Sequence, residues 1–287
     1  MRLVTFRTNG GSALGAVQGD EVVEVEQPHA MLALIDAGTE GLARVKAAVE
    51  SSRSRRHVLA DLELLAPLPE PRGNVIAIGR NYQKHAEETA KNKAPEPPTV
   101  FTKAITSLTE PFADIAIDPS VSDRIDWEVE LGVIIGRRGA NLKRSDARGY
   151  VFGYMALNDV TARDIQSGWG GQYFKGKSLD RTSPTGPWIV TADEIGDPQK
   201  LELRLRVNGV TKQDGNTGDM IYPVDALIEW VSRGMTLLPG AIIATGTPDG
   251  VGFARTPPEF LKPGDVMETE VQGIGTMRNR IVAAGRD

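Results

Sequence analysis

The clearest pattern in the chain is an alternation of apolar and polar residues between positions 124 and 136. Successive side chains point to opposite faces of a β-strand. One face of this predicted strand is apolar and belongs in a core; it carries Trp127, Val129, Leu131, Val133 and Ile135. The other face carries Asp126, Glu128 and Glu130, whose negative charges repel one another at this spacing. Two explanations are open: the acids face water, or a cation holds them together in a concave site.

Shorter apolar runs predict strands along the rest of the chain. These runs are residues 3–6, 16–17, 21–25, 74–79, 100–103, 150–159, 188–191, 201–207, 241–245, 266–271 and 275–282. Asn208-Gly209 predicts a tight hairpin, and the last two runs should pair with each other. Apolar residues at helical spacing predict helices over residues 31–51 and 224–233. Strands outnumber helices and are mostly joined by turns, which predicts a β-rich α+β fold with mixed, largely antiparallel sheets.

A proline-punctuated segment around residues 64–72 reads as a linker. It divides the chain into a small N-terminal α+β domain, residues 1–70, and a larger β-rich domain, residues 71–287. A chain of 287 residues can bury cores of both sizes.

Composition narrows the functional classes. The net charge of -5 gives no electrostatic attraction to nucleic acid or to an anionic membrane. No window approaches the ~20 apolar residues of a membrane span, and the first residues lack the pattern of a signal peptide. The chain contains no cysteine, which excludes disulfides, zinc-thiolate sites and cysteine nucleophiles. We therefore expect a cytoplasmic enzyme that acts on a small molecule.

Three features carry candidate chemistry. Glu128 and Glu130 share a strand face, and Asp159 ends an apolar strand, where a charge is costly unless it is paired or bound to metal. His85 and Glu88 lie three residues apart on a predicted helix and can touch. An all-oxygen set of carboxylates suits a hard cation, Mg2+ first, with Mn2+ or Ca2+ as alternatives. The glycine-rich residues 246–252 lack the lysine of a phosphate-binding loop.

An ordered series of motifs then points to a family. The series is Gly79-Arg-Asn-Tyr-Gln-Lys-His-Ala-Glu-Glu88, Pro98-Thr-Val-Phe-Thr-Lys103, Asp126-Trp-Glu-Val-Glu-Leu131, Asn158-Asp-Val-Thr-Ala-Arg-Asp-Ile-Gln166, Gly176-Lys-Ser-Leu-Asp180, Asn208-Gly-Val, residues 239–252 and Leu261-Lys-Pro-Gly-Asp265. Each motif alone is weak, but their order is specific. From about residue 79 to the C-terminus the chain resembles the fumarylacetoacetate hydrolase family, in particular its acylpyruvase-like and 2-hydroxyhepta-2,4-diene-1,7-dioate isomerase-like members.

The resemblance implies a fold, an assembly and a metal site. The catalytic domain would be a mixed, rolled β-sheet around the metal, and the protein would be a homodimer. Glu128, Glu130 and Asp159 would bind the cation, the same three carboxylates that the residue pattern indicates. Asp126 is outside the family's ligand pattern, and we expect it to be a solvated acid.

The resemblance also assigns roles around the metal. His85 and Glu88 would activate water, with Glu87 as the alternative acid, and Lys177 would offset the charge of an oxyanion or carboxylate. The residue positions add substrate contacts: Arg163 and Gln166, four and seven residues beyond Asp159 on one helical face, could clamp a substrate carboxylate, and Thr247 could donate its hydroxyl or amide to one. Several of these assignments have a structural alternative: Arg163 could pair with an acid such as Asp164 or Glu130, and Thr247 could serve turn geometry alone. His85 could be a surface or helix histidine with a structural partner, and Lys177 an ordinary surface lysine.

The leading function is a Mg2+-dependent hydrolase that cleaves a C–C bond of a 2,4-diketo acid, giving pyruvate and a carboxylic acid through a metal-stabilised enolate. Alternatives on the same site are a decarboxylase of oxaloacetate type and an isomerase of 2-hydroxy-diene dioates. A third hypothesis is a metal-stabilised binding protein without turnover. Residues 172–175 depart from the family pattern, which leaves the substrate open. Closure of residues 91–98 over the site would exclude water.

Overall fold

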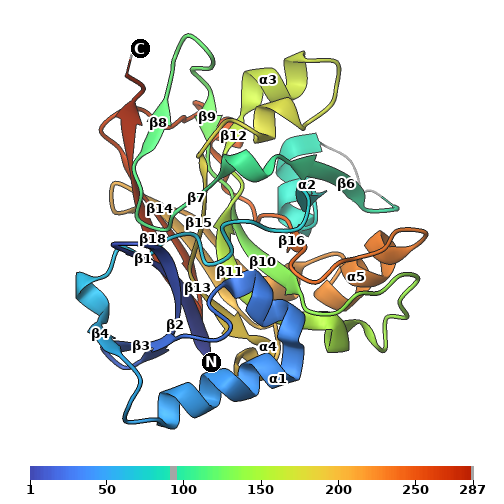
Figure 1. Cartoon of the computed structure of the whole chain (residues 1–287). Coiled ribbons are helices and arrows are strands. Elements are labelled where there is room, and N and C mark those ends of the chain that lie inside the picture. Colours follow the sequence, from blue (N-terminus) through green and yellow to red (C-terminus); the bar gives the residue numbers. More distant parts are fainter. Residues whose placement is uncertain (91–95, 286–287) are drawn as a thin grey trace.

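β-Strands dominate the computed structural model, which describes residues 1–90 and 96–285 (Figure 1). Its α-helices are α1 (Met31–Glu50), α2 (Gln83–Ala90), α3 (Arg163–Gly168), α4 (Ala192–Ile195) and α5 (Val224–Ser232). The helices lie around the sheets and do not alternate regularly with parallel strands. The predicted β-rich α+β class is confirmed. The predicted lid segment lies in large part outside the described residues.

The central feature is a large mixed sheet. Within the described residues its hydrogen-bonded order is β4-β3-β2-β1-β13-β11-β10-β16-β5-β6, with β7 paired to β13. These strands are β1 (Arg2–Thr8), β2 (Gly11–Gln18), β3 (Glu21–Val25), β4 (Arg56–Val58), β5 (Val75–Gly79), β6 (Thr99–Lys103), β7 (Leu108–Thr109), β10 (Val129–Ile135), β11 (Val151–Asn158), β13 (Ser183–Thr191) and β16 (Ile242–Ala244). Neighbours are antiparallel except β16–β5 and β13–β7. The predicted mixed, largely antiparallel pairing is confirmed.

A second sheet packs against the first. Its order is β15-β14-β17-β18-β8, and β9 and β12 form a separate two-stranded ladder. The strands are β8 (Ile115–Ile117), β9 (Ile125–Asp126), β12 (Thr161–Ala162), β14 (Glu202–Val207), β15 (Val210–Asn216), β17 (Val266–Val271) and β18 (Gly275–Ala283). Asn208 and Gly209, with φ of 52° and 77°, make the predicted hairpin between β14 and β15. The predicted pairing of the last two strands is also confirmed.

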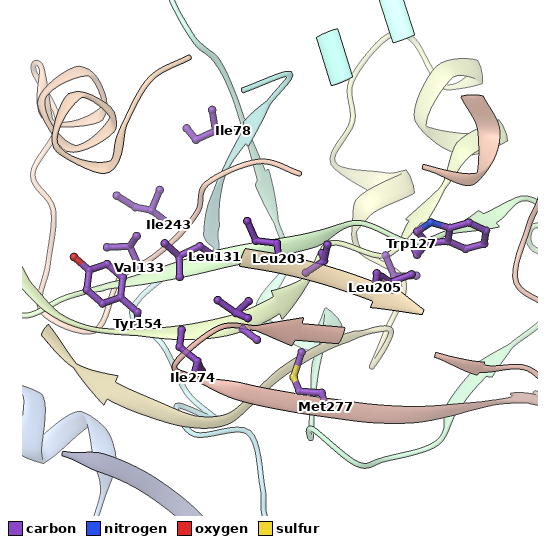
Figure 2. Packing of buried hydrophobic residues seen from close by; sticks show 14 of the residues in the cluster. Ile78, Trp127, Leu131, Val133, Tyr154, Leu203, Leu205, Ile243, Ile274 and Met277 are labelled. Atoms are coloured by element: carbon purple, nitrogen blue, oxygen red, sulfur yellow. The ribbon is translucent and has the colours of Figure 1, made fainter. Parts of the chain in front are cut away.

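The main core lies between the two sheets. All five apolar residues of the alternating segment at 127–135 belong to it, as predicted. Figure 2 shows Leu131 of β10 beside Leu203 of β14 and Val133 beside Tyr154 and Ile243, and Met277 of β18 belongs to the same cluster. On the other face of the large sheet, Ile134 joins a second core that includes residues of α1. Because each buried aliphatic side chain contributes about 1.5–3 kcal/mol, β10 is firmly fixed, and so are the acids at its beginning.

The N-terminal strands extend the same sheet that carries β10 and β11. β1 pairs antiparallel with β13, so β1 to β4 continue outward from it (Figure 1). α1 forms as predicted, with a kink at Gly38, where φ is 54°. The division of the chain at residue 70 stays a prediction.

Candidate active site

Three buried carboxylates converge where β10 begins and β11 ends. These two strands pair antiparallel with Val129 opposite Asn158. This register brings Glu128 next to Asp159, and the Asp159 amide donates to the Glu128 carbonyl at 2.9 Å. One carboxylate oxygen from each of Glu128, Glu130 and Asp159 lies within 4.8 Å of the others. The side chains predicted as metal ligands are therefore brought together, in the interior and not on a solvated face.

The surroundings shift the pKa values of Glu130 and Glu128 in opposite directions. Burial raises the pKa of Glu130 well above its usual range, and the negative charges of Asp159 and Glu128 raise it further. Burial acts in the same direction on Glu128, but the cations Lys177 and Arg163 outweigh it and lower the pKa of that carboxyl to about 2. An additional positive charge would favour ionised Glu130.

Two buried lysines form ion pairs with the carboxylate of Asp159. The Lys177 ammonium lies 2.6 Å from Asp159 Oδ2 and 2.7 Å from Glu128 Oε2. The Lys103 ammonium lies 2.7 Å from Asp159 Oδ1 and also donates to the Lys177 carbonyl. Lys103 was not predicted as a site residue, although its side chain is fully buried at the end of β6. The signal available was a lysine closing an apolar strand, where an unpaired ammonium would be costly.

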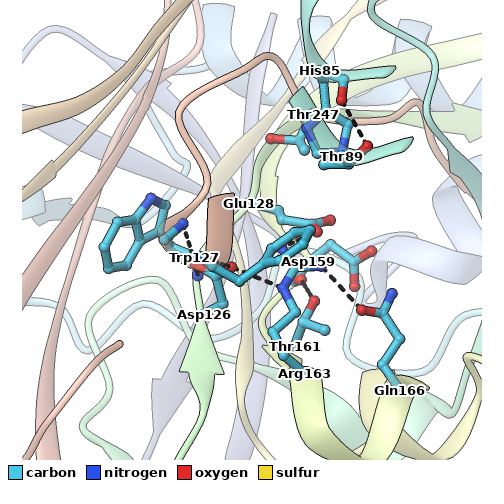
Figure 3. Close-up of polar contacts among 12 residues, drawn as sticks. His85, Thr89, Asp126, Trp127, Glu128, Asp159, Thr161, Arg163, Gln166 and Thr247 are labelled. Carbon is cyan, nitrogen blue, oxygen red and sulfur yellow. Dashed lines mark hydrogen bonds and ion pairs between the residues drawn. The ribbon is translucent and has the colours of Figure 1, made fainter. Parts of the chain in front are cut away.

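Asp126 is a buried structural acid, so the expectation of a solvated carboxylate is wrong. The predicted continuous strand is interrupted: β9 ends at Asp126 and β10 begins at Val129. The carboxylate of Asp126 accepts backbone N–H groups of Trp127 at 2.8 Å, Gly252 at 2.7 Å and Phe253 at 3.1 Å. Figure 3 shows Asp126 beside Trp127 and Arg163, and the group of carboxylates that could hold a metal ion consists of Glu128, Glu130 and Asp159, without Asp126.

Arg163 of α3 connects this acid to the metal cluster. Its Nε lies 2.8 Å from Asp126 Oδ2 and its Nη2 lies 2.7 Å from Glu128 Oε1. Arg163 does pair with acids, as its structural alternative predicted, but those acids are Asp126 and Glu128 and not Asp164 or Glu130.

The Arg163 guanidinium also contacts Gln166 and the ring of Phe253. Nη1 of Arg163 donates to Gln166 Oε1 at 3.1 Å (Figure 3), and the group lies over the Phe253 ring, 4.2 Å from its centroid. Arg163 and Gln166 thus form one unit beside the carboxylates.

His85 and Glu88 form the predicted contact on α2. Nδ1 of His85 lies 2.9 Å from Glu88 Oε1, and the imidazole is almost fully buried. Glu88 also accepts the N–H of Gly250 at 3.1–3.2 Å. Glu87, the alternative acid, instead accepts from Gln83 at 2.6 Å. The pair is thus His85 with Glu88.

The glycine-rich turn after β16 directs its amides at carboxylates. Gly246 N–H donates to Glu130 Oε2 at 2.8 Å, in addition to the amide bonds to Glu88 and Asp126 described above. The Thr247 hydroxyl donates to the Val129 carbonyl at 2.9 Å and accepts from Gln213. The hydroxyl proton of Thr247 is therefore already used within the protein.

Several of these groups line a cavity of about 270 Å³. Its lining is Ile78, Gly79, Arg80, His85, Thr89, Phe101, Glu128, Glu130, Arg163, Gln166, Ser167, Tyr173, Lys177, Thr247 and Phe253. Tyr173 belongs to the loop whose sequence departs from the family pattern, and its ring packs edge-on against Phe101 at 5.4 Å. Since small-molecule sites commonly measure about 300–1,000 Å³, this cavity suits a compact ligand.

The acidic triad fits a divalent cation. Carboxylate oxygens are the ligands that Mg2+, Mn2+ and Ca2+ prefer, and the three oxygens are close enough to share one ion. Glu130 is held by one amide and no cationic side chain among the described residues. A cation would supply the opposite charge that this buried carboxylate lacks.

A comparison with protein families identifies the family to which the larger part of the chain belongs. Residues 74–282 match the fumarylacetoacetate hydrolase C-terminal model. The chain belongs to the fumarylacetoacetate hydrolase family. The members it resembles are enzymes, so the chain is an enzyme of this family with a divalent-metal site. Within the described residues, helices long and apolar enough to cross a membrane are absent.

Relatives with assigned reactions are similar over much of their length. Oxaloacetate tautomerase YisK of Bacillus subtilis (strain 168) is 45% identical over 224 residues, covering 78% of this chain and 74% of that protein. The mitochondrial oxaloacetate tautomerase fahd2 of Xenopus laevis is 38% identical over 294 residues, covering 98% and 90%. The structure of maleylpyruvate hydrolase from Sphingobium sp. SYK-6, in complex with manganese(II) and pyruvate, superimposes with a TM-score of 0.84 at 31% identity, covering 99% and 100%.

Proposed function

We propose that this enzyme interconverts the keto and enol forms of a small 2-oxo acid of the oxaloacetate type. The observation that carries the proposal is His85, which contacts Glu88 and lines the same 270 Å³ cavity as the triad carboxylates Glu128 and Glu130. A keto–enol conversion needs one group that moves a proton on and off carbon, next to a site that stabilises negative charge on oxygen. Two relatives named oxaloacetate tautomerases support the choice of substrate.

The tautomer of His85 determines which nitrogen reacts. Glu88 is an acceptor when ionised, so it holds the proton on Nδ1 and leaves the Nε2 lone pair free. Nε2 removes a proton from C3 of the 2-oxo acid, and the C–H electron pair becomes the C2–C3 double bond. The imidazolium then gives up a proton to the C2 oxygen, directly or through water, which returns His85 to its neutral form. The reverse sequence restores the ketone, so no other reactant is consumed.

The remaining residues orient the acid and balance its charge. A divalent cation held by the carboxylate triad would act as a Lewis acid toward the 2-oxo group and its carboxylate. Lys177 lies against two of those carboxylates and would offset negative charge that develops in the cavity. Arg163 and Gln166 would bound the substrate on the α3 side. Since the hydroxyl of Thr247 is engaged, its amide is the group we assign to a substrate carboxylate.

Hydrolysis of a 2,4-diketo acid remains the second candidate. The observation that favours it is the likeness to a maleylpyruvate hydrolase holding manganese and pyruvate. Hydrolysis would need the same His85 to deliver water to a carbonyl, whereas tautomerisation needs it to exchange a proton with carbon. Membership in a family of enzymes argues against the third hypothesis, a binding protein without turnover.

The test compares His85→Gln with His29→Gln, a change at an exposed histidine outside the cavity. The Mg2+-loaded proteins receive the enol of oxaloacetate, and the loss of enol absorbance is followed. We expect His85→Gln to lower kcat by about 10²–10⁴-fold, the usual contribution of general acid–base catalysis, with metal affinity by calorimetry unchanged. A full rate in His85→Gln would contradict the proposal. Cleavage of acetylpyruvate without enol turnover would favour the hydrolase.

Three further properties are predictions that extend this proposal. Mg2+ as the native metal is tested by comparing turnover after Mg2+ or Mn2+ is added to metal-free protein. A homodimer is tested by light scattering after gel filtration. A cytoplasmic location is tested by fractionating cells that express the native gene.

A further inference from the structure

Arg80 differs from the other cations that line the cavity. Arg163 contacts two carboxylates and Lys177 contacts two, each at 2.6–2.8 Å. Among the described residues, Arg80 forms no ion pair, and its hydrogen bonding is one long contact, 3.4 Å from Nη2 to Thr99 Oγ1. Its Nε is buried and lacks a hydrogen-bond partner within that part of the chain. A guanidinium offers five N–H donors, so most of the donors of Arg80 remain available to a ligand.

The backbone holds this arginine in an unfavourable conformation. Arg80 has a φ of 55°, in the left-handed region that residues with a Cβ seldom adopt. Such a conformation persists only where the surroundings impose it, and it is common at ligand sites. Here the constraint comes from the next residue, Asn81, whose side chain is fixed by three hydrogen bonds. It donates to the Thr245 carbonyl at 2.7 Å and to the Tyr222 carbonyl at 3.0 Å, and it accepts the Tyr222 N–H at 2.9 Å. The strained turn therefore keeps Arg80 at the cavity.

The charges around the metal site show which ligand group this arginine would serve. The cluster holds four carboxylates, those of the metal triad and Asp126, against three paired cations, Lys103, Lys177 and Arg163. In the proposed orientation a divalent cation at the triad would bind the carboxylate next to the 2-oxo group. The cations of the cluster are already paired with its own carboxylates, whereas most donors of Arg80, which lines the same cavity, are not. Those donors suit a second negative group on the ligand.

We propose that Arg80 binds the distal carboxylate of a 2-oxo dicarboxylic acid and so selects dicarboxylates over acids with a neutral tail. The inference rests on the proposed function for the orientation of the ligand, with its 2-oxo acid end at the metal triad. An arginine fork suits this task because it donates two parallel hydrogen bonds to one carboxylate. In this assignment Arg80 contributes to substrate recognition, and proton transfer remains with His85.

The experiment measures binding and needs no turnover. Mg2+-loaded protein is titrated by calorimetry with 2-oxoglutarate and with 2-oxopentanoate, which have the same chain length and differ in the distal carboxylate. The wild type should bind 2-oxoglutarate more tightly. Arg80→Gln should weaken that ligand by about 10- to 100-fold, the usual effect of losing charge-assisted hydrogen bonds, and should change 2-oxopentanoate by less than about threefold. Arg80→Lys should fall between, because it keeps the charge and loses the fork.

Two controls keep the result interpretable. Arg80→Gly removes the guanidinium and relieves the left-handed strain, so the same selective loss in this variant cannot be attributed to misfolding. Lys84→Gln, at an exposed position of α2, should leave both affinities unchanged. Equal losses for both ligands, or no loss for either, would overturn the assignment of Arg80. Failure of the proposed tautomerase would appear instead as normal binding selectivity with no enol turnover in the wild type.

Discussion

Replacing Asp126 by Asn should destabilise the protein much more than an ordinary loss of an ion pair. The side chain is fully buried, and each of its oxygens accepts two donors. Oδ1 accepts the N–H groups of Trp127 and Gly252, and Oδ2 accepts those of Phe253 and Arg163. Whichever oxygen becomes an NH2 group, that group meets two donors. Because breaking a buried pair from one side costs about 3–5 kcal/mol, we expect a loss of this size in the free energy of unfolding.

The assay is urea unfolding followed by tryptophan fluorescence at neutral pH. The matched control is Glu63→Gln, which also turns an acid into an amide but breaks the exposed ion pair with Arg7, whose side chains are 62% and 52% exposed. That pair should contribute little to stability, because both of its charges are exposed to solvent. If Asp126→Asn is no more destabilising than Glu63→Gln, the structural role assigned to Asp126 is wrong.

Two further predictions concern the metal site and the sheet. Burial, and then two neighbouring carboxylates, raise the pKa of Glu130. A divalent cation must therefore displace a proton from Glu130 at any pH below that pKa. The affinity for the cation should rise with pH, and binding should release a proton in that range. Calorimetry in two buffers of different ionisation enthalpy measures this, and a pH-independent affinity without proton release would refute it. Gly153→Ala should cost about 1–3 kcal/mol in thermal unfolding, because a Cβ would lie 2.4 Å from the Val190 carbonyl oxygen. Gly149→Ala, whose Cβ meets nothing within 4 Å, is the control and should be neutral; equal effects would contradict the packing argument.

Local pattern predicted the elements well where one physical cause determined them. The alternation from Trp127 to Ile135 reflects burial against the second sheet, so it identified the core face without knowledge of the partner strands. The choice of Glu128 and Glu130 followed from acids on one strand face, and the choice of Asp159 from an acid at the end of an apolar strand, where a charge is costly unless it is compensated. The helix-spaced pair His85 and Glu88 was likewise readable, because the contact is made within one turn of one helix.

What sequence did not predict depends on distant partners. Asp126 shares the alternation of its neighbours, but its carboxylate is buried against backbone amides more than a hundred residues away in the sequence. The partners of Arg163 were missed because the same bonds place Asp126 beside it. Lys103 read as the end of a strand, and its role as a contact of Asp159 appears only once β6 and the end of β11 are both placed. The left-handed conformation of Arg80 likewise depends on bonds from Asn81 to two remote segments.

The turn that follows β16 fixes the distances between three carboxylates of the site, because its amides bond to all three. Its amide at Gly246 meets the metal-triad acid Glu130, and its amide at Gly250 meets Glu88, which orients the histidine. Two residues later the chain meets Asp126. The spacing between the metal cluster and the proton-transfer pair is therefore set by the number of residues in one short segment. An insertion or deletion in this turn should therefore disrupt the active site far more than a change of side chain on the outer face of α2.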